Sequence, residues 1–425
     1  MAKKQNTPAT LSYGIGRNSH LHVVESDSVS RLAPFEVVER KGLGHPDTLC
    51  DALACALSRA YALFTMENCD GLILHHQFDK IMLIGGKSEV SFGKLGFFSE
   101  PIRLIISGRA STHYKGARLP VKQILEETAR NYLASIVMIP DLKRDLIIEH
   151  KWTNSAGPGT ICESEGPIAQ MFTPLDESYV RGYGAHYVSN DTSYCSAYTP
   201  MTVLETAVLN VEKSLNSMQI KEKHQWMGTD IKIMATRIGE SIYVTMCIPQ
   251  IARFVPTMEA YRKNLDVSRE LIQMLFSNYL NVDHLDLSLN TKDNFKENNV
   301  YLTATGSSLS GDIGVTGRGN RINGLITANR PMSLEGASGK NPRYYAGIVY
   351  NLAAKHLSQR LFLEFGYANE VIIVSQNGDP LLSPKHIIVL TDGRAGQALL
   401  DTVESCVSNI PELTQKYLEG DIDLY

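Results

Sequence analysis

The sequence is poor in the features that most quickly assign a chain to a functional class. It has seven cysteines in 425 residues, and none lies in a CxxC pair or in a Cys/His cluster with zinc spacing. This pattern argues against a disulfide framework and against a structural zinc site. We therefore expect reduced, buried thiols, as in a cytosolic protein.

Long apolar runs and a strong charge of one sign are also missing. No run approaches the roughly 20 apolar residues of a membrane span, and the first residues lack the apolar core of a signal peptide. The formal net charge of −4 gives no general attraction for nucleic acid or for a membrane surface. We therefore expect a cytoplasmic enzyme that binds neither nucleic acid nor a membrane. The content of 43% hydrophobic residues is sufficient for a large core.

Strand-like and helix-like patterns alternate along the whole chain. Period-2 alternation predicts strands at residues 72–84, 102–107, 146–150, 230–236, 241–248, 300–305, 371–375 and 386–391. Helical periodicity predicts helices at residues 46–64, 121–137, 200–218, 256–280, 342–366 and 396–408. This mixture indicates an α+β fold built of α/β layers.

Three of the predicted helices share a proline at the expected first helical position. Pro46, Pro200 and Pro342 lie about 150 residues apart, each after a polar residue that could cap the helix. The spacing suggests three related units rather than one doubly wound sheet.

The segment from Glu39 to Asp51 carries the strongest local signal. It runs from a predicted strand through two glycines into a helix, with His45 at the helix entrance. Asp47 and Asp51 are four residues apart and share a helix face, and a helix N-terminus suits phosphate. The set fits a metal–polyphosphate centre, although a capping histidine and dipole-compensating aspartates would give the same pattern.

Residues 306–341 are rich in glycine and in basic side chains. Eight glycines lie there with Asp312, Arg318, Arg321 and Lys340, a composition suited to close approach of a polyphosphate. Neither the Walker A pattern nor GxGxxG is present. The alternative is a long surface loop, but a loop of this length in a compact domain is usually functional.

Two shorter segments add polar residues at the starts of predicted elements. Residues 189–194 precede the helix at Pro200 and contain Asp191. Asp230 and Lys232 begin a predicted strand, where a spacing of two places both on one face. An ordinary turn and a surface ion pair are the alternatives.

The chain resembles the archaeal-type methionine adenosyltransferases (S-adenosylmethionine synthetases) in five motifs that occur in the same order. These are GHPDTLCD, NDTS, GTDIKIM, GRGNRINGLI followed by NRPMSLE, and GKNP. The resemblance extends from about Val37 to the C-terminus. It implies a reaction in which the sulfur of L-methionine attacks C5′ of ATP by an SN2 displacement and expels triphosphate, which is then hydrolysed to diphosphate and phosphate.

The resemblance also implies an architecture. It predicts the S-adenosylmethionine synthetase fold, with three similar domains around a pseudo-threefold axis that are discontinuous in sequence. The expected divisions are residues 1–43 with 204–306, residues 44–180 with 307–347, and residues 181–203 with 348–425.

Roles for individual residues follow from the matching motifs. His45 would lie near the bridging oxygen on C5′, Asp191 would contact methionine and nucleoside, and Asp230 would hold the ribose. The expected catalytic residues are His45, Lys232, Arg318 and Lys340, the expected ATP- or substrate-binding residues are Asp191, Asp230, Asp312, Arg321 and Ser338, and the expected metal ligand is Asp47.

The family's cofactors and assembly give further expectations. They are Mg²⁺ in two sites, K⁺ as a further candidate, ATP and L-methionine as small-molecule partners, and a homodimer or dimer of dimers with active sites at the subunit interface. Tyr344, Tyr345 and Ile348 depart from the family's Asn, His and Lys. Two alternatives therefore stay open: a homologue that transfers adenosyl or another nucleoside to a different acceptor, and a non-catalytic regulatory subunit.

Overall fold

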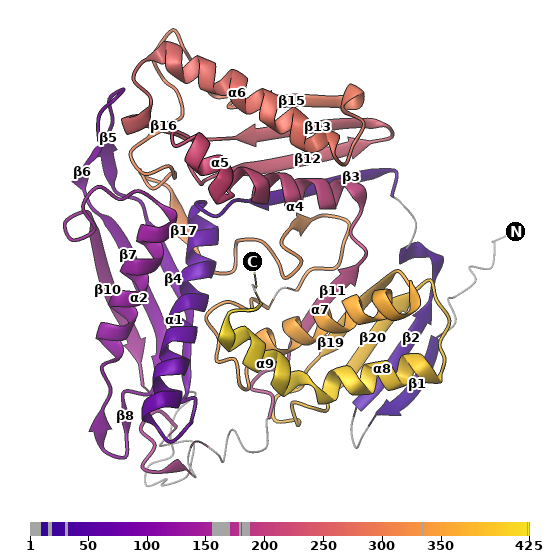
Figure 1. Cartoon of the computed structure of the whole chain (residues 1–425). Helices are drawn as coiled ribbons and strands as arrows, with labels where there is room; N and C mark the ends of the chain where they lie inside the picture. The colour runs from indigo at the N-terminus through magenta and orange to yellow at the C-terminus, as the bar shows by residue number, and fades with distance from the viewer. Residues whose placement is uncertain are drawn as a thin grey trace, which may run out of the picture.

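The computed structural model (Figure 1) describes residues 10–15, 19–29, 33–154, 171–177, 180, 188–333, 335–422 and 424. These residues form three main sheets and several two-stranded ribbons. In each main unit the helices contact one another, and they lie on the same face of the sheet (Figure 1). The predicted α+β class is confirmed.

The first unit contains the expected phosphate motif. Its sheet has the order β10–β7–β4–β17, with α1 and α2 on one face. The bounds are β4 (His76–Ile84), β7 (Ile102–Ala110), β10 (Leu146–Thr153), β17 (Ile313–Val315), α1 (Pro46–Asn68) and α2 (Val121–Ile136). Leu53 and Leu57 of α1 pack against Ile81 and Leu83 of β4 in a fully buried core. This core holds the start of α1 against β17.

The second unit supplies the strand that leads into α1. Its sheet has the order β15–β13–β12–β3–β18, and α4 and α6 pack on it. The bounds are β3 (Phe35–Lys41), β12 (Lys232–Ile238), β13 (Ser241–Cys247), β15 (Leu285–Leu289), β18 (Ile326–Thr327), α4 (Val203–Leu215), α5 (Met218–Lys223) and α6 (Met258–Ser277). A capping box between Thr202 and Glu205 begins α4.

The third unit joins the two ends of the chain. Its sheet has the order β1–β2–β20–β19–β11, covered by α7, α8 and α9. The bounds are β1 (Thr10–Ile15), β2 (Ser19–Glu25), β11 (Tyr194–Thr199), β19 (Asn369–Val374), β20 (His386–Thr391), α7 (Ala346–Phe365), α8 (Gln397–Ser408) and α9 (Ile410–Glu419). Gly366 ends α7 with φ of 71°, a backbone conformation that glycine adopts without a Cβ clash.

The sheet pairing differs from the division expected for residues 1–43. Strands β1 and β2 belong to the third unit, because β2 runs parallel to β20 from His20 to Glu25. Only β3 of that range joins the second unit, and β18 from the range 307–347 joins it too. Long-range pairing of this kind leaves no local trace in the sequence. The sheets therefore do not follow the expected division at these strands, and the division into domains stays a prediction.

The expectation of three alike helix starts holds only for Pro46. Thr202 caps α4 two residues after Pro200, and α7 begins at Ala346, four residues after Pro342. Before α7, the Asn341 side chain accepts from the N–H of Arg343 at 3.0 Å, which stabilises a turn rather than a helix. The predicted strand at residues 300–305 is reduced to β16 (Leu302–Thr303).

The glycine-rich segment passes through the middle of the molecule (Figure 1) and contacts all three units. Gly317 and Gly319 donate backbone N–H groups to Asp51 of the first unit. Gly324 accepts from Arg40 of β3, and Ser333 accepts from the N–H of Ser196 in β11 at 2.7 Å. The segment is therefore an ordered connection between units, and the surface-loop alternative is wrong for its described residues.

Helix α1 is the one described helix long and apolar enough, by length and composition, to cross a membrane. Of that apolar window, 67% is buried inside the fold, as expected for a core helix. Six cysteines are free thiols in the described part of the chain and five of them are buried, which agrees with the expectation of reduced thiols. Cys162 lies outside the described residues.

Candidate active site

Helix α1 begins at the residues that the sequence singles out. His45 is its N-cap and Pro46 occupies the first turn. The N–H of Asp47 donates to His45 Nδ1 at 3.2 Å, so the neutral ring carries its proton on Nε2. Burial lowers the pKa of His45, against the opposing effect of the carboxylates of Asp230 and Asp47. Near pH 7 the ring is thus a neutral hydrogen-bond donor through Nε2.

Asp47 joins the helix start to two other segments. Its Oδ2 accepts from Lys41 Nζ at 2.8 Å, and its Oδ1 accepts from the N–H of Val315 at 3.0 Å. Burial works to raise the pKa of Asp47, but these hydrogen bonds outweigh it and the pKa is lowered. Asp47 is therefore an ionised carboxylate held in a fixed position.

Asp51, one turn further along α1, anchors the glycine-rich segment. Its two oxygens accept from the N–H groups of Gly317 at 2.7 Å and Gly319 at 3.0 Å. Burial raises the pKa of Asp51 to about 6, although the hydrogen bonds oppose the shift. Gly319 has no room for a side chain, since a Cβ there would lie 2.3 Å from Asp51 Oδ2. The shared face of Asp47 and Asp51 predicted from the sequence is confirmed; this anchoring role was not predicted.

A cleft of about 660 Å³ opens beside the start of α1. Four of the expected site residues line it: His45, Asp230, Lys232 and Asp312. Asp230 is buried, and its Oδ2 accepts from the N–H of Ser308 at 3.0 Å and from the hydroxyl of Tyr301 at 3.2 Å. Burial raises the pKa of Asp230, against the effect of His45 and of these hydrogen bonds. Asp312 is an exposed carboxylate at the same cleft.

Two lysines meet at the junction of β3 and β12. Lys232 lies opposite Lys41 in the antiparallel pair, so both side chains project on one face. The carboxylate of Glu39 lies 3.6 Å from Lys232 Nζ and 4.0 Å from Lys41 Nζ. The sequence analysis did not assign Glu39 or Lys41 to the site, although both lie in the segment from Glu39 to Asp51.

The two arginines of the glycine-rich segment differ in their surroundings. Arg321 donates from Nη1 to the carbonyl oxygens of Gly317 at 3.0 Å and Gly319 at 2.9 Å, and it thus holds the loop from within. The side chain of Arg318 is exposed, and its carbonyl accepts from Lys41 Nζ at 2.6 Å. Direct contact of either guanidinium with a nucleotide stays a prediction.

Six expected site residues do not line the cleft: Asp47, Arg318 and Arg321, described above, and Ser338, Lys340 and Asp191. Ser338, within the glycine-rich segment, forms a hydrogen bond with Asp51 through its hydroxyl. Lys340 is buried and forms an ion pair with Glu335. Asp191 is exposed before β11, within electrostatic range of Lys340. Burial lowers the pKa of Lys340, and the carboxylate of Asp191 is among the charges that oppose the shift.

The residues that depart from the family pattern are largely internal. Tyr344 is buried and its hydroxyl is 2.7 Å from His75 Nδ1. Tyr345 is half-buried and donates to Gln77 Oε1 at 2.6 Å, and Ile348 is fully buried in the core of the third unit.

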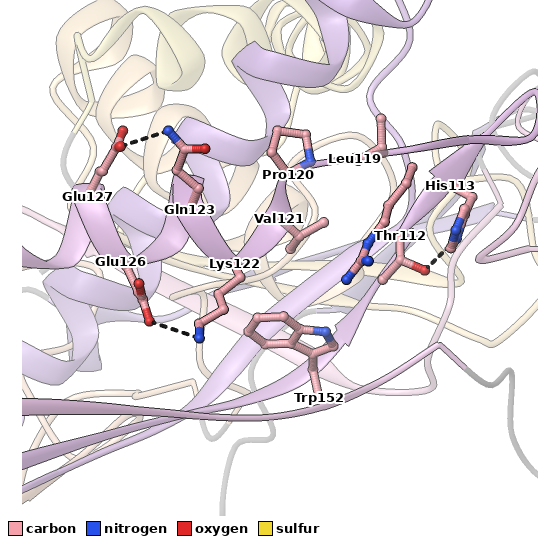
Figure 2. Close-up of a pocket in the computed structure, with 11 residues that line it drawn as sticks. Thr112, His113, Leu119, Pro120, Val121, Lys122, Gln123, Glu126, Glu127 and Trp152 are labelled. Atoms are coloured by element: carbon pink, nitrogen blue, oxygen red, sulfur yellow. Dashed lines mark hydrogen bonds and ion pairs between the residues drawn. The ribbon is translucent and has the colours of Figure 1, made fainter.

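A second cavity of about 730 Å³ lies between the start of α2 and β10 (Figure 2). Its carboxylates are engaged: Glu126 with Lys122 and His150, and Glu127 with Gln123. None of the expected site residues lines it. The cleft beside His45 is therefore the candidate active site.

The donor set at the cleft fits a hard metal ion bound together with its ligand. Within the described ranges, no group of three His, Cys, Asp or Glu side chains is placed to hold a metal. Mg²⁺ commonly takes only one or two protein carboxylates and completes its shell with water and phosphate oxygens. Asp47 and Asp312 offer such carboxylates, so the site fits Mg²⁺ carried by a polyphosphate rather than a preformed metal cage.

Comparison with known proteins identifies the family of the chain. Residues 17–421 match the family model for S-adenosylmethionine synthetase (AdoMet synthetase). The S-adenosylmethionine synthase of Haloarcula marismortui is 33% identical over 421 residues, which cover 96% of this chain and 99% of the relative. That of Aeropyrum pernix is 34% identical over 420 residues, covering 95% and 99%.

A solved structure supports the fold. The structure of an unusual S-adenosylmethionine synthetase from Campylobacter jejuni superimposes with a TM-score of 0.55 at 13% identity, over 91% of this chain and 88% of that one. Taken together, the matches define an enzyme of the transferase class. The chain belongs to the S-adenosylmethionine synthetase family.

Proposed function

We propose that this chain forms S-adenosylmethionine from ATP and L-methionine in the cleft beside His45. The sulfur of methionine attacks C5′ of ATP, the C5′–O bond breaks, and its electron pair leaves with the triphosphate. The observation that carries the proposal is the convergence of His45, Asp230 and Lys232 on one cleft, beside the Asp47–Lys41 pair. Triphosphate hydrolysis to diphosphate and phosphate would follow in the same site.

The chemistry needs little proton transfer, because a thioether is already a nucleophile. The barrier lies in the charge that develops on the leaving triphosphate, so catalysis is electrostatic and positional. His45 Nε2–H would donate a hydrogen bond to the leaving oxygen, and its neutral state at pH 7 follows from burial. Lys41 and Lys232, adjacent across β3 and β12, would hold phosphate oxygens.

The ribose would lie at Asp230. This carboxylate is fixed by Ser308 and Tyr301, which leaves acceptor capacity for the sugar hydroxyls. Arg318 lies on an exposed turn of the glycine-rich segment, and its guanidinium would contact the phosphates from there. Arg321 supports this turn directly, through its hydrogen bond to the carbonyl of Gly317. Ser338 supports it indirectly, through its hydrogen bond to Asp51.

Metal ions enter the proposal through the ATP phosphates. Asp47 and Asp312 would hold Mg²⁺ that, when bound, neutralises part of the charge on the phosphate oxygens. Two Mg²⁺ ions, with K⁺ as an additional activator, are the cofactors we propose. A cytoplasmic location stays a prediction.

The direct experiment incubates the purified chain with ATP, L-methionine, Mg²⁺ and K⁺ and follows S-adenosylmethionine by mass spectrometry and phosphate release by colorimetry. We expect both products, with a loss of at least tenfold in kcat/KM for Lys232→Met. Lys263→Met, an exposed lysine on α6, is the matched control and should retain full activity. If no S-adenosylmethionine forms at any substrate concentration, the proposal fails.

We further propose a homodimer that assembles through the sheet faces without helices. On the first sheet, Met82 and Ile147 have exposed fractions of 37% and 43%, and Ile313 on β17 reaches 51%. These side chains point away from the face that α1 and α2 cover, because Ile81, Leu83 and Leu146 beside them fill the core. An exposed apolar sheet face of this kind favours a second copy. Within one chain, we propose that a pseudo-threefold axis relates the three units.

Light scattering tests the assembly. The dimer should have twice the chain mass of 47.1 kDa, and Met82→Glu should shift the population toward monomer. Met274→Glu, on the exposed side of α6, is the control that should leave the mass unchanged. A monomeric wild type at micromolar concentration would contradict the proposed dimer.

A further inference from the structure

The second cavity, between the start of α2 and β10, shares no lining residue with the cleft beside His45. Its volume of about 730 Å³ lies within the range of about 300–1,000 Å³ that is usual for small-molecule sites in proteins. The space is therefore sufficient for a small organic ligand, and the side chains that line it decide which chemistry such a ligand must have.

The second cavity and the start of α1 lie at opposite ends of the first sheet. The first turn of α1 contacts β17, which pairs with Ile84 at the end of β4. Ile84 lies opposite Arg103, near the beginning of β7, whereas Thr112 of the cavity follows the last residue of β7. The nine residues of β7 span about 26 Å, at about 3.3 Å per residue. Within one chain, a ligand in the second cavity is thus remote from the cleft beside His45.

One side of the second cavity is aromatic. Trp152, near the end of β10, is half-buried, and Figure 2 shows its indole facing the start of α2. The ring of His150 packs edge-on against this indole, with the ring centroids 4.6 Å apart and an angle of 71° between the planes. Leu119, Pro120 and Val121 contribute apolar atoms on the α2 side. A half-buried indole beside apolar side chains favours a ligand with a planar ring.

The carboxylates of the second cavity lie at one end of it and already have partners. Glu126 Oε1 lies 3.7 Å from Lys122 Nζ and 2.9 Å from His150 Nε2. Glu127 Oε1 accepts from Gln123 Nε2 at 2.9 Å. Figure 2 shows both glutamates at the same end of the cavity. The negative charge at this end is thus compensated within the protein, chiefly by Lys122.

The other end of the second cavity presents a cationic side chain. The ribbon of β8 (His113–Tyr114) and β9 (Ala117–Arg118) places His113 directly opposite Arg118, and both line the cavity. In Figure 2, Trp152 lies between this histidine and the glutamate end. Arg118 is exposed, and its guanidinium has no ion pair among the residues that the structure describes. A guanidinium binds phosphate or carboxylate oxygens through two parallel N–H groups, so this end favours an anionic group.

We propose that the second cavity binds a small planar anion, with its ring on the indole of Trp152 and its phosphate or carboxylate at Arg118. Flat rings of different chemistry stack on tryptophan, nucleobases included. The guanidinium fork matches the oxygens of either anionic group. A nucleoside monophosphate and an aromatic carboxylate share this chemistry. Binding here does not require the proposed function, because none of the lining residues has a role in that reaction.

The tryptophans of the chain give a direct readout of binding. Trp152 and Trp226 are the only two, so in Trp226→Phe the fluorescence of tryptophan reports on the second cavity alone. We expect uridine monophosphate or phenylacetate to quench this fluorescence saturably, with a Kd below about 1 mM. Uridine and phenylacetamide lack the anionic group, and ribose 5-phosphate lacks the ring, so each should bind at least tenfold more weakly. Binding of the nucleotide identifies a phosphate ligand, and binding of phenylacetate identifies a carboxylate.

Replacements in the Trp226→Phe chain locate the bound ligand. Arg118→Gln should weaken binding of the anion at least tenfold and leave the weak binding of its uncharged analogue unchanged, because only the contact with the anionic group is lost. Arg103→Gln, an exposed arginine of the same unit that does not line the cavity, is the matched control and should keep the affinity. Lys232→Met, at the cleft beside His45, should keep it as well.

Isothermal titration calorimetry on the unaltered chain measures the same affinities without any replacement. If neither uridine monophosphate nor phenylacetate binds the unaltered chain, the second cavity is not a site for planar anions. The same conclusion follows if folded Arg118→Gln binds the anion as tightly as its parent. If Lys232→Met weakens binding, the ligand lies in the cleft beside His45 and the proposal is wrong. Saturable binding that Arg118→Gln weakens and Arg103→Gln does not is the expected result.

Discussion

The replacement Asp51→Asn separates the stability of the fold from the geometry of the site. Asp51 has a pKa of about 6 in the fold against an ordinary value of 3.8, because it is buried. A raised pKa means that the folded state binds the proton more tightly, so this carboxyl stabilises the fold at low pH. That contribution is complete below pH 3.8 and is lost as the pH rises through 6.

The magnitude follows from the two pKa values. With about 1.4 kcal/mol per pKa unit, the wild type should gain about 1 kcal/mol of unfolding free energy from this group as the pH falls from 7 to 5. Asn cannot take up the proton and lacks this gain. At pH 7 the variant loses one hydrogen-bond acceptor for the N–H of Gly317 or Gly319, which lowers its unfolding free energy by about 1–3 kcal/mol. It also avoids the cost of burying an ionised carboxylate, which raises its unfolding free energy by about 3 kcal/mol.

Urea denaturation followed by circular dichroism at pH 7 and pH 5 measures this difference. The stability of the wild type relative to Asp51→Asn should rise by about 1 kcal/mol from pH 7 to pH 5, since only the wild type is stabilised. The kcat/KM should fall at least tenfold at pH 7, because the turn with Arg318 loses its anchor. Asp286→Asn, an exposed residue of β15, is the control. A gap that is equal at both pH values would refute the reasoning.

Three other replacements test separate parts of the structure. Gly314→Ala should destabilise the fold by about 1–3 kcal/mol or more in urea denaturation, since its Cβ would lie 2.0 Å from the carbonyl oxygen of Pro46. Leu57→Ala in the α1 core should cost about 2–5 kcal/mol, whereas Leu63→Ala, 40% exposed on the same helix, should cost less than about 1 kcal/mol. His45→Ala should lower kcat by about 10²–10³-fold, as the loss of a hydrogen-bond donor to the leaving oxygen does, while the melting temperature shifts by only a few degrees.

Helices that bury one face were predictable from the sequence because their pattern is local. The predicted helix at residues 121–137 corresponds to α2, and the one at 396–408 to α8. The predicted helix at 200–218 corresponds to α4, which ends at Leu215, whereas α5 (Met218–Lys223) and α9 (Ile410–Glu419) were not predicted. A capping box decides where α4 begins, and a short turn decides where it ends. Both positions also depend on which side chains are buried in the core, so a local pattern does not fix them.

The candidate site was predictable in its residue types but not in its grouping. His45 at the helix entrance and the shared face of Asp47 and Asp51 follow from residue spacing. The separation of Lys340 and Asp191 from the cleft lining depends on where the third unit packs, which no local pattern encodes. The pairing of Gln77 with Arg109 could not be predicted, because it depends on the register of β4 and β7.

The sequence by itself determined the family of the chain and the chemistry of its first motif, because proline, glycine and charged residues at fixed spacing constrain a short stretch of backbone directly. Only the tertiary structure decided that β2 pairs with β20, that Asp51 anchors the glycine-rich segment, and that Gln77 lies opposite Arg109. These relations join residues far apart in the chain. They are fixed by the burial of three cores and by backbone hydrogen bonds between strands, and the free energy of such contacts depends on the whole fold rather than on neighbours in sequence.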